Sequence, residues 1–482
     1  MHPDVLIAGA GPTGLTLACE LARRGVPTLL VERAPALFPG SRGKGLQPRT
    51  LEIFEDLGVL GEIRAAGRRY PPMLPWTDGR PGEPFALTPA ATATEQVPHP
   101  ETWMVPQWRT QEILYTRLRE LGGDVRFGAE LAGFTQDDNG VTAEITGIGT
   151  VTARYLVAAD GGRSTVRRSL GVPMIGETVD PRPSLVADLR LTGLDREHWH
   201  VFPQAPGGPL ALCPMPGTDD FQLYAQYEDG EPDPSADGVR AVVAARTHLG
   251  PDAVTEIRWA SDFRPRAALA ERFRIGRVLL AGDAAHVHSP AGGQGLNTSV
   301  QDAYNLGWKL AHLLRHGADA ELLLDSYQAE RLPVAADVLD ISTSIHRAGP
   351  LAGQPGTDRR RAQRGKDTDQ LAVGYRGGPL SVDHRESVPE DALQAGDRAP
   401  DAHLPDGTRL FDALRGTHAT LVTTAAEPPA VPAGVRALRH DAYGPATDHP
   451  TLYLIRPDGY LGLVTRNAAD LAPYLALLGL SD

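Results

Sequence analysis

Near its start the chain reads Val5-Leu6-Ile7-Ala8-Gly9-Ala10-Gly11-Pro12-Thr13-Gly14. The apolar run is typical of a buried strand, and apolar residues at three- and four-residue spacing over 15–22 predict a helix directly after the glycines. In such a unit the first glycine permits a tight turn, the second lets a pyrophosphate approach the backbone, and the third lets helix and strand pack closely. The stretch therefore predicts an α/β dinucleotide-binding unit.

The residues that follow are those such a unit needs to hold a nucleotide. A second apolar run, 26–31, ends at Glu32 and Arg33. Glu32 lies near the offset at which an acidic side chain binds ribose hydroxyls, and the N-terminus of the first helix would face the phosphates. This first motif by itself does not separate FAD from NAD.

A second glycine motif lies far downstream, at Gly282-Asp283, behind the apolar run 277–281. Asp283, at the end of a strand, can accept hydrogen bonds from the ribityl hydroxyls of FAD. The turn 292–295 then opens a long helix, whose N-terminus can stabilise the negative charge of a reduced flavin. A nicotinamide dehydrogenase needs only the first motif, so the pair of motifs predicts FAD.

Composition narrows the class of protein. The chain has 482 residues, 41% hydrophobic and 22% charged, which is ordinary for a globular protein of two or three domains. The net charge of −13 argues against nucleic acid or an anionic membrane as partner. No apolar run approaches the roughly 18 residues of a membrane span. Since the first strand begins almost at the initiator Met, no signal peptide is expected, and we expect a cytoplasmic protein.

We expect no metal site and no disulfide. Cys19 and Cys213 are the only cysteines and form no CxxC pair. His286 and His288 are expected to have no acidic or cysteine partner, so His286 is expected to pack or to form hydrogen bonds.

The pattern also predicts domain boundaries. Short alternating strands separated by Pro-Gly turns, between 183 and 228, indicate an antiparallel sheet inserted into the nucleotide domain. We expect residues 70–105 to be irregular and to contribute to the inserted unit. The expected domains are an FAD-binding domain at 1–175 and 266–390, an inserted substrate domain at 176–265, and a small α/β domain at 396–482.

Together these motifs resemble the class A flavoprotein aromatic monooxygenases, the group of p-hydroxybenzoate hydroxylase. The chain is similar to their branch of aromatic-polyketide hydroxylases, rifampicin monooxygenase and phenol-hydroxylase-like enzymes. The resemblance rests on residues 9–14, on Asp160-Gly161 with Arg163, Ser164 and Arg167, on Gly282-Asp283, and on the helix 295–309. It implies a glutathione-reductase-like Rossmann FAD domain, an inserted antiparallel sheet, and a C-terminal thioredoxin-like domain that lacks redox cysteines.

The resemblance also implies a set of FAD-binding residues, with FAD held non-covalently. Arg42 and Pro290 are expected beside the flavin as candidate catalytic residues, Lys44 matches a companion basic position, and Asp160-Gly161 is associated with NAD(P)H as well as FAD. The expected FAD contacts are Gly9, Gly11, Pro12, Thr13, Gly14, Glu32, Arg33, Arg42, Gln107, Arg109, Asp160, Gly161, Asp283, Pro290, Gly293, Gly295, Leu296 and Asn297.

The implied reaction is hydroxylation of a phenolic or polyketide-type aromatic. NAD(P)H would reduce FAD, O2 would add at C4a, and the C4a-hydroperoxide would deliver oxygen to the substrate. A substrate chamber is expected between the inserted sheet and the flavin. Its candidate lining residues are Tyr224, Gln226, His200, Trp103 and Phe263. His200 and Tyr224 are candidate catalytic residues, because a phenol reacts faster as a phenolate.

Several alternatives remain open from the sequence. The same scaffold supports Baeyer–Villiger oxygen insertion and the hydroxylation of small phenols. A halogenase is less favoured because the chain contains no Trp-x-Trp-x-Ile-Pro element, and an idle flavoprotein is disfavoured by the intact Asp160-Gly161. A high content of Arg, Ala, Gly and Pro is typical of proteins from GC-rich bacteria. In such a source, antibiotic biosynthesis or modification is a plausible setting. The sequence leaves open the substrate, the choice of NADPH or NADH, the general base, and whether the protein is a monomer or a homodimer.

Overall fold

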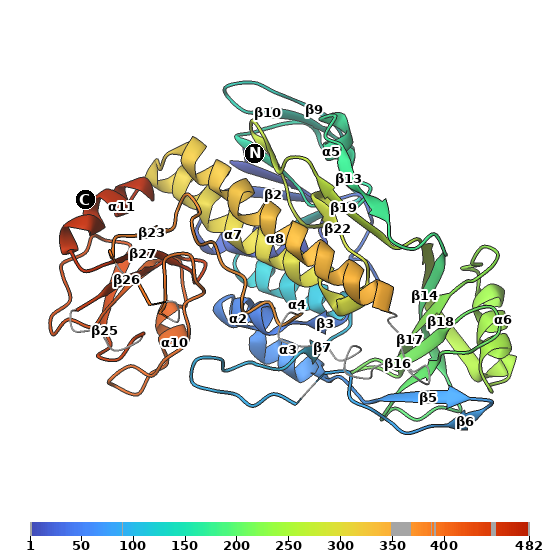
Figure 1. The fold of residues 1–482 in the computed structure, drawn as a ribbon. Helices are drawn as coiled ribbons and strands as arrows, with labels where there is room; N and C mark the ends of the chain where they lie inside the picture. Colours follow the sequence, from blue (N-terminus) through green and yellow to red (C-terminus); the bar gives the residue numbers. More distant parts are fainter. Residues whose placement is uncertain are drawn as a thin grey trace.

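The computed structural model describes residues 2–88, 90–348, 368–386, 388–389, 392–444 and 450–480. Figure 1 shows helices α7 and α8 running through the middle, the C-terminal residues at one end and a separate sheet, around β14 and β17, at the other. Within these residues no helix is long and apolar enough to cross a membrane.

The first glycine motif belongs to a six-stranded sheet. Its strands pair in parallel except at the β20–β21 edge, and β1 lies between β12 and β2. All four residues of β1 are buried, as their apolar character predicts. In order across the sheet, the strands are β20(Arg274–Ile275), β21(Val278–Leu280), β12(Tyr155–Ala158), β1(Val5–Ala8), β2(Thr28–Glu32) and β8(Val125–Phe127).

Helices pack on this sheet and on one another. Helix α1 contacts both α4 and α7, and α7 contacts α8. Helix α7 ends at Gly317, whose φ of 68° is the left-handed conformation that commonly terminates a helix. The helices are α1(Pro12–Arg23), α2(Pro48–Asp56), α3(Leu60–Ala66), α4(Gln107–Glu120), α5(Thr165–Ser169), α7(Gly295–His316) and α8(Ala320–Ala348).

Three small sheets lie around this core. One joins β9(Leu131–Gln136), β10(Val141–Ile145) and β11(Gly149–Ala153). A second joins β13(Met174–Thr178), β19(Arg266–Ala270) and β22(His286–Val287), and the third joins β3(Gly45–Leu46), β7(Trp103–Met104) and β4(Arg68–Arg69).

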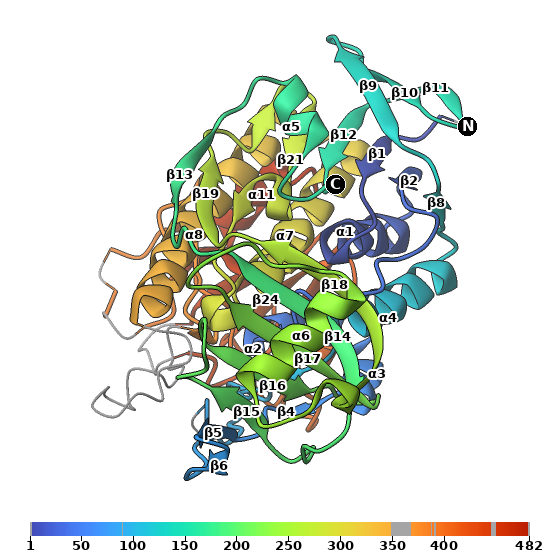
Figure 2. The ribbon, with the colours of Figure 1, turned by 90° about the vertical axis from the view of Figure 1, so that its right-hand side faces the viewer.

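The seven-stranded sheet is the unit that Figure 2 shows facing the viewer, with α6(Ala236–Arg246) lying over it. Its outer face is apolar and buries side chains such as Leu185, Leu189 and Leu223 against Val239 and Val243 of α6. In order the strands are β18(Val254–Phe263), β14(Ser184–Leu191), β17(Asp220–Gln226), β16(Leu210–Pro214), β15(Trp199–Phe202), β5(Met73–Thr77) and β6(Arg80–Pro81).

The edge of this sheet comes from a segment expected to be irregular. Strand β5 pairs in parallel with β15, and β6 forms the outermost strand. The expectation of irregular structure throughout 70–105 was therefore wrong. Pro75 and Pro81 weakened the strand signal, but prolines are tolerated near a sheet edge.

The C-terminal residues form a five-stranded mixed sheet with its own apolar core. Its strand order is β23(Val382–Asp383), β27(Leu461–Thr465), β26(Leu452–Ile455), β24(Ala419–Thr423) and β25(Val435–Arg439), accompanied by α10(Leu410–Leu414) and α11(Leu471–Leu477).

A buried group of charged side chains, which we call the seam, joins this sheet to α7 and α8. Glu330 of α8 accepts hydrogen bonds from Arg456 at 2.6 Å and from Lys309 of α7 at 2.7 Å. Arg456 also pairs with Asp458 at 2.5 Å. Burial alone would raise the pKa of Glu330, but Arg456 and Lys309 lower it below its usual value.

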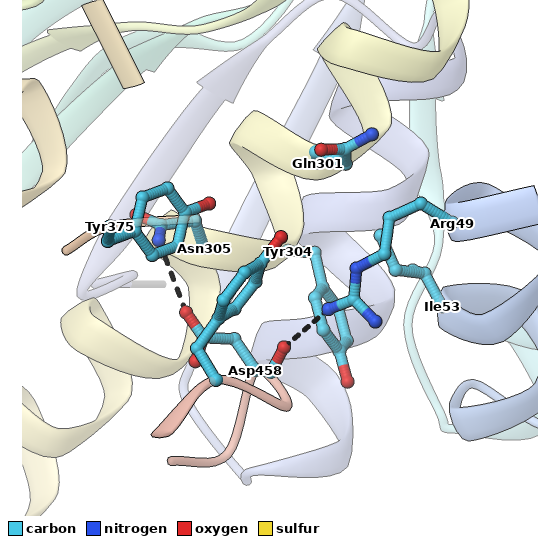
Figure 3. Close-up of a pocket in the computed structure, with 8 residues that line it drawn as sticks. Arg49, Ile53, Gln301, Tyr304, Asn305, Tyr375 and Asp458 are labelled. Carbon is cyan, nitrogen blue, oxygen red and sulfur yellow. Dashed lines mark hydrogen bonds between the residues drawn. The ribbon is translucent and has the colours of Figure 1, made fainter. Parts of the chain in front are cut away.

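Figure 3 shows a small pocket at the edge of the seam, where Asp458 lies between α2 and α7. Its backbone carbonyl accepts a hydrogen bond from Arg49 of α2 at 2.7 Å, and its carboxylate accepts one from Asn305 of α7 at 3.2 Å. The turn between β26 and β27 is thus held by two helices of the nucleotide-binding part.

Candidate functional site

The first glycine motif forms the turn that its sequence predicts. Gly9 has a φ of +103°, and a Cβ there would lie 2.4 Å from the carbonyl oxygen of Ala159. A Cβ on Gly14 would lie 1.9 Å from the carbonyl oxygen of Gly9, so any side chain would push helix and strand apart. Beside Gly11 there is open space, and no side chain caps α1. The backbone N–H groups of the first helical turn therefore face an open cradle suited to a phosphate.

The two glycine motifs meet in space. Gly282 lies so close to Thr13 that a Cβ would come within 2.4 Å of the threonine hydroxyl. On the other side of the first motif, Gly9 touches Ala159, directly before Asp160. Three segments distant in the sequence thus converge at the carboxyl ends of β1, β12 and β21, where nucleotides bind in sheets of this kind.

Glu32 closes one side of the first turn. Its carboxylate accepts hydrogen bonds from the amides of Ala10 and Ala34, each at 2.9 Å. The carboxylate is therefore fixed next to the glycine turn, while Arg33 is exposed beside it. This position suits an acid that binds a ribose next to the cradle.

Asp160 precedes α5, accepts the first two amides of this helix and leaves one oxygen unused. One carboxylate oxygen accepts the amides of Thr165 and Val166 at 2.8 and 3.2 Å, while Oδ1 is buried and has no partner among the described residues. Arg167 donates to the carbonyl oxygen of Ala284 at 3.0 Å. The Asp160-Gly161 segment is thereby tied to the second motif, which gives Arg167 a structural role, whereas Arg163 is exposed.

A buried chain of polar side chains holds the second motif. Asp302 of α7 accepts the amide of Gly282 at 3.0 Å and bonds Nε2 of His286 at 2.6 Å. Nδ1 of His286 lies 2.8 Å from Nε2 of His288, and Arg331 donates to the other oxygen of Asp302 at 2.7 Å. Burial opposes the charge on Asp302, but His286 and Arg331 keep the pKa of this carboxyl below its usual value.

Sequence reasoning missed Asp302, because it follows His286 by a full helical segment rather than by a motif spacing. His286 has an acidic partner after all. The described residues contain no group of three side chains suited to a metal ion.

Asp283 lies in a recess. Its side chain reaches solvent, yet protein surrounds it closely enough for desolvation to raise its pKa, an effect that His286 and Arg42 partly oppose. Arg42 and Asp283 are therefore close enough to influence each other across the recess. The carboxylate is available to accept hydrogen bonds from a bound molecule.

The loop 41–44 lies against the same recess. The amide of Gly43 donates to the side chain of Gln107 at 2.9 Å, and a Cβ on Gly43 would lie 3.3 Å from Leu296. Next to it, Asn297 bonds the amide of Gln47 at 2.8 Å and the carbonyl oxygens of Gly45 and Gly293, each at 2.8 Å. Four of the expected cofactor residues, Gln107, Gly293, Leu296 and Asn297, thus come together around this loop.

Pro290, Gly295 and Arg109, which were also expected to contact the cofactor, show fewer contacts with the loop 41–44. Pro290 is exposed, immediately before a turn in which Gly292 and Gly293 have φ values of 82° and 64°; α7 then begins at Gly295 with no side-chain cap. Arg109 is exposed on α4 and pairs with Glu112 at 2.9 Å. The first turn of α7 meets the loop 41–44 through Leu296, whereas Arg109 is already paired.

The structure decides which face of β17 is packing. Phe221, Leu223 and Ala225 join the apolar core under α6. The other face, which we call the inner face, carries Gln222, Tyr224 and Gln226 on β17. It continues with Ser184, Val186 and Asp188 on β14 and with Trp259, Ser261 and Phe263 on β18.

Tyr224 lies in the middle of the inner face. Its hydroxyl is 3.2 Å from that of Ser184, and its ring centre is 6.3 Å from that of Phe263. Burial raises the pKa of Tyr224. Beside it, Gln226 donates to Asp180 at 2.8 Å, and Asp180 is 3.3 Å from His346, which bonds Ser289 at 2.9 Å. The inner face is therefore polar along this edge and connected to the segment before Pro290.

The structure does not bring His200 or Trp103 to Tyr224. His200 pairs with Leu212 and shares the outer face with Phe202 and Leu210. It is fully buried; Trp76 donates to its Nδ1 at 3.1 Å, and its Nε2 donates to the carbonyl oxygen of Asp195 at 2.9 Å. Burial also lowers its pKa. Trp103 lies in the β3–β7–β4 sheet and donates to the carbonyl oxygen of Ile63 at 3.2 Å.

The comparisons with known proteins agree with this geometry. Residues 2–342 match the family model described as FAD binding domain, so the chain belongs to this family. A flavin-dependent monooxygenase of Mycobacteroides abscessus is 45% identical over 98% of this chain and 99% of its own.

Solved structures give the same result. The OxyS anhydrotetracycline hydroxylase from Streptomyces rimosus has a TM-score of 0.78 and 32% identity, with complete coverage of both chains. The ternary complex of aklavinone-11 hydroxylase with FAD and aklavinone has a TM-score of 0.76 and 28% identity over 99% of each chain. The chain is an FAD-dependent monooxygenase, as its sequence motifs predicted.

Proposed function

We propose that this monooxygenase uses NAD(P)H and O2 to hydroxylate a phenolic or polycyclic polyketide-type aromatic. The observation that carries the proposal is the juxtaposition of the recess at Asp283 and the loop 41–44 with the partly polar inner face of the inserted sheet. Relatives covering nearly all of this chain are named as acting on such molecules: an anhydrotetracycline monooxygenase and an aklavinone hydroxylase.

The glycine cradle would hold the pyrophosphate of FAD, and Glu32 would hold the ribose. Asp283 would bind the ribityl chain, and the segment 290–297 would border the flavin ring. When bound, FAD supplies the transfer of electrons from the nicotinamide to O2 and of one oxygen atom to the substrate. The fit rests on the steric exclusion of side chains at Gly9 and Gly14 and on the open space at Gly11.

The substrate would lie between the inner face and the segments 41–44 and 288–296. Tyr224 would orient a substrate hydroxyl through its own hydroxyl, and the apolar residues Val186 and Phe263 would exclude water from the aromatic ring. Arg42 and Pro290 would contact the flavin side. His200 is left out of the proposed catalytic set, because both of its ring nitrogens are occupied on the outer face.

The proposed domains follow from the sheets. Residues 1–175 and 266–390 would form a glutathione-reductase-like FAD domain, 176–265 with β5 and β6 the substrate domain, and 396–482 a thioredoxin-like domain. Both cysteines lie outside the last of these, which supports a structural role for it. We propose that the protein acts as a monomer or homodimer.

The test is NADPH oxidation by FAD-loaded protein at saturating O2, with and without a panel of phenols, tetracyclic polyketides and ansamycin-type aromatics. We expect one compound to accelerate oxidation and to gain a single oxygen atom by mass. NMR of the product would distinguish a new phenol from a ketone-derived ester or lactone. A panel that leaves both oxidation and product mass unchanged would contradict the proposed substrate class.

A further inference from the structure

A buried carboxyl group on the inner face lacks a hydrogen bond of normal geometry among the described residues. Asp188 lies in the middle of β14, directly opposite Gln222 of β17, and is only 2% exposed. Neither carboxylate oxygen accepts a hydrogen bond of normal geometry from the residues that the structure describes, and Ser41 is the donor that lies beside it. The hydroxyl and the backbone amide of Ser41 interact with this carboxylate and lower its pKa, but the hydroxyl makes no hydrogen bond of normal geometry among the described residues. Buried polar groups are nearly always satisfied, so this exception requires an explanation.

A cation that acts on Asp188 belongs to the loop 41–44. Nζ of Lys44 donates to the amide oxygen of Gln222 and lies 4.5 Å from the centre of the Trp199 ring. The amide nitrogen of Gln222 in turn donates to the carbonyl oxygen of Ser41. One side chain of the sheet thus holds this loop at two points.

Asp188 is a second acceptor next to the first. Residues paired across antiparallel strands have Cβ atoms about 5 Å apart, so the carboxylate of Asp188 and the amide of Gln222 lie side by side. A lysine side chain bonded to one can reach the other by rotations about its own bonds. Lys44 therefore has a choice between a neutral acceptor and an ionisable one.

The loop 41–44 connects the acceptors of Lys44 with the recess at Asp283. Arg42 follows Ser41 and precedes Gly43, and Gly43 contacts Gln107 and Leu296. The guanidinium of Arg42 lies 5.9 Å from the Trp259 ring of β18 and acts electrostatically on Asp283. Movement of Lys44 between its two acceptors would alter the place of Arg42 in the recess.

We propose that Asp188 is a positioning residue: when ionised it takes Lys44 from Gln222, and when protonated it returns Lys44, which moves Arg42 relative to the flavin. The only covalent change is the exchange of one proton between Asp188 and solvent. The proposal rests on the proposed placement of FAD beside the loop 41–44, not on the identity of the aromatic substrate.

The surroundings of Asp188 make this exchange possible near neutral pH. Burial raises the pKa of Asp188 to about 7, while Ser41 and Lys44 oppose the rise and Asp220 of β17 adds to it. Arg258 of β18 faces Asp220 and pairs with it at 2.5 Å, and Arg190 of β14 lies 3.6 Å from the same carboxylate. Cys213 of β16 is the titratable neighbour paired with Gln222. Lys44 is the cation that faces Asp188 from the loop.

The experiment follows the flavin itself. FAD-loaded full-length protein, without nicotinamide or substrate, is titrated from about pH 5.5 to 9, with flavin absorbance and fluorescence recorded. We expect a one-proton transition centred near pH 7, where Asp188 titrates. The transition should vanish in Asp188→Asn and in Lys44→Met, and return with a shifted midpoint in Asp188→Glu.

A matched control is Asp262→Asn. Asp262 is exposed on the neighbouring strand and pairs with Leu185, so its side chain belongs to the outer face. This variant should keep the transition. A transition that persists in Asp188→Asn, or that is absent from the unmodified protein, would overturn the proposal. Because the readout needs bound FAD but no turnover, failure of the hydroxylation assay leaves it interpretable.

Discussion

The seam and the inner face both bury charged groups, but they differ in how completely those groups are paired. In the seam, the side chains of Glu330, Arg456, Lys309 and Asp458 are at most 1% exposed, and each is paired within 2.7 Å. On the inner face, Asp188 is 2% exposed, and neither of its oxygens has a hydrogen bond of normal geometry among the described residues. Complete pairing is typical of a fixed junction, whereas the incompletely bonded carboxylate of Asp188 lies where Lys44 has a second acceptor within reach.

The same contrast separates the two ends of the molecule in Figure 1. The C-terminal sheet is attached through donors that each have several acceptors: Arg456 bonds both Glu330 and Asp458. The inserted sheet is attached to the loop 41–44 through two hydrogen bonds of Gln222 and through the Trp199 and Trp259 rings, which lie next to Lys44 and Arg42. We therefore expect the seam to govern stability and the inner face to govern the reaction.

Breaking the seam should have the largest effect. Glu330→Ala leaves Arg456 and Lys309 buried without their shared carboxylate, and removing one partner of a buried pair costs about 3–5 kcal/mol. Urea denaturation should show a loss of unfolding free energy of this size. Glu321→Ala on the same helix removes a carboxylate that is 78% exposed, and should cost less than about 1 kcal/mol. Equal losses of unfolding free energy in Glu330→Ala and Glu321→Ala would show that the buried pairs of the seam contribute no more to stability than an exposed pair does.

Glu32 tests whether the first glycine turn binds the cofactor. Glu32→Ala removes the fixed acceptor beside the cradle, and hydrogen bonds to a charged group contribute about 1.5–3 kcal/mol. FAD affinity, measured by fluorescence titration, should fall roughly ten- to hundredfold. Glu120→Ala, exposed on α4, is the control and should leave FAD affinity unchanged. Unaltered affinity in Glu32→Ala would place the ribose elsewhere.

Asp188 should make stability depend on pH. Its pKa is raised to about 7 in the folded protein from 3.8, so the folded state retains a proton that the unfolded state has lost. Stability from this group is therefore greatest at low pH and falls as pH rises through 7. One pKa unit corresponds to about 1.4 kcal/mol, which is the loss expected between pH 6 and 8. In Asp188→Asn this part of the pH dependence of urea denaturation should disappear; an unchanged slope would show that Asp188 is ionised throughout.

The smallest effect is expected at Tyr224. Tyr224→Phe removes the hydroxyl beside Ser184 but keeps the ring against Phe263, and one hydrogen bond contributes about 1 kcal/mol. We expect kcat/KM for the accelerating substrate to fall about fivefold. Tyr227→Phe keeps its ring against Arg246, away from Tyr224, and should leave kcat/KM unchanged. Matching losses in the two variants would argue against a substrate contact at Tyr224.

The sequence was sufficient to predict those features whose residues follow one another along the chain. The strand, glycine turn and helix at 5–23 follow from apolar periodicity and from positions where a side chain would collide with backbone. The two motifs and the family resemblance predicted FAD and a monooxygenase, and the family match and relatives confirm both. Tyr224, Gln226 and Phe263, which the sequence offered as lining residues, all lie on the inner face of the inserted sheet.

Tertiary structure decided everything that depends on partners from distant segments. His286 bonds to Asp302, which belongs to α7. The register of β15 places His200 on the outer face of the sheet, and the register of β14 places Asp188 opposite Gln222. A shift of one residue in either strand would reverse these faces, and the residue that lies opposite each of them belongs to another segment of the chain. The sequence determined which residues carry chemistry; the pairing of strands and helices determined which of them meet.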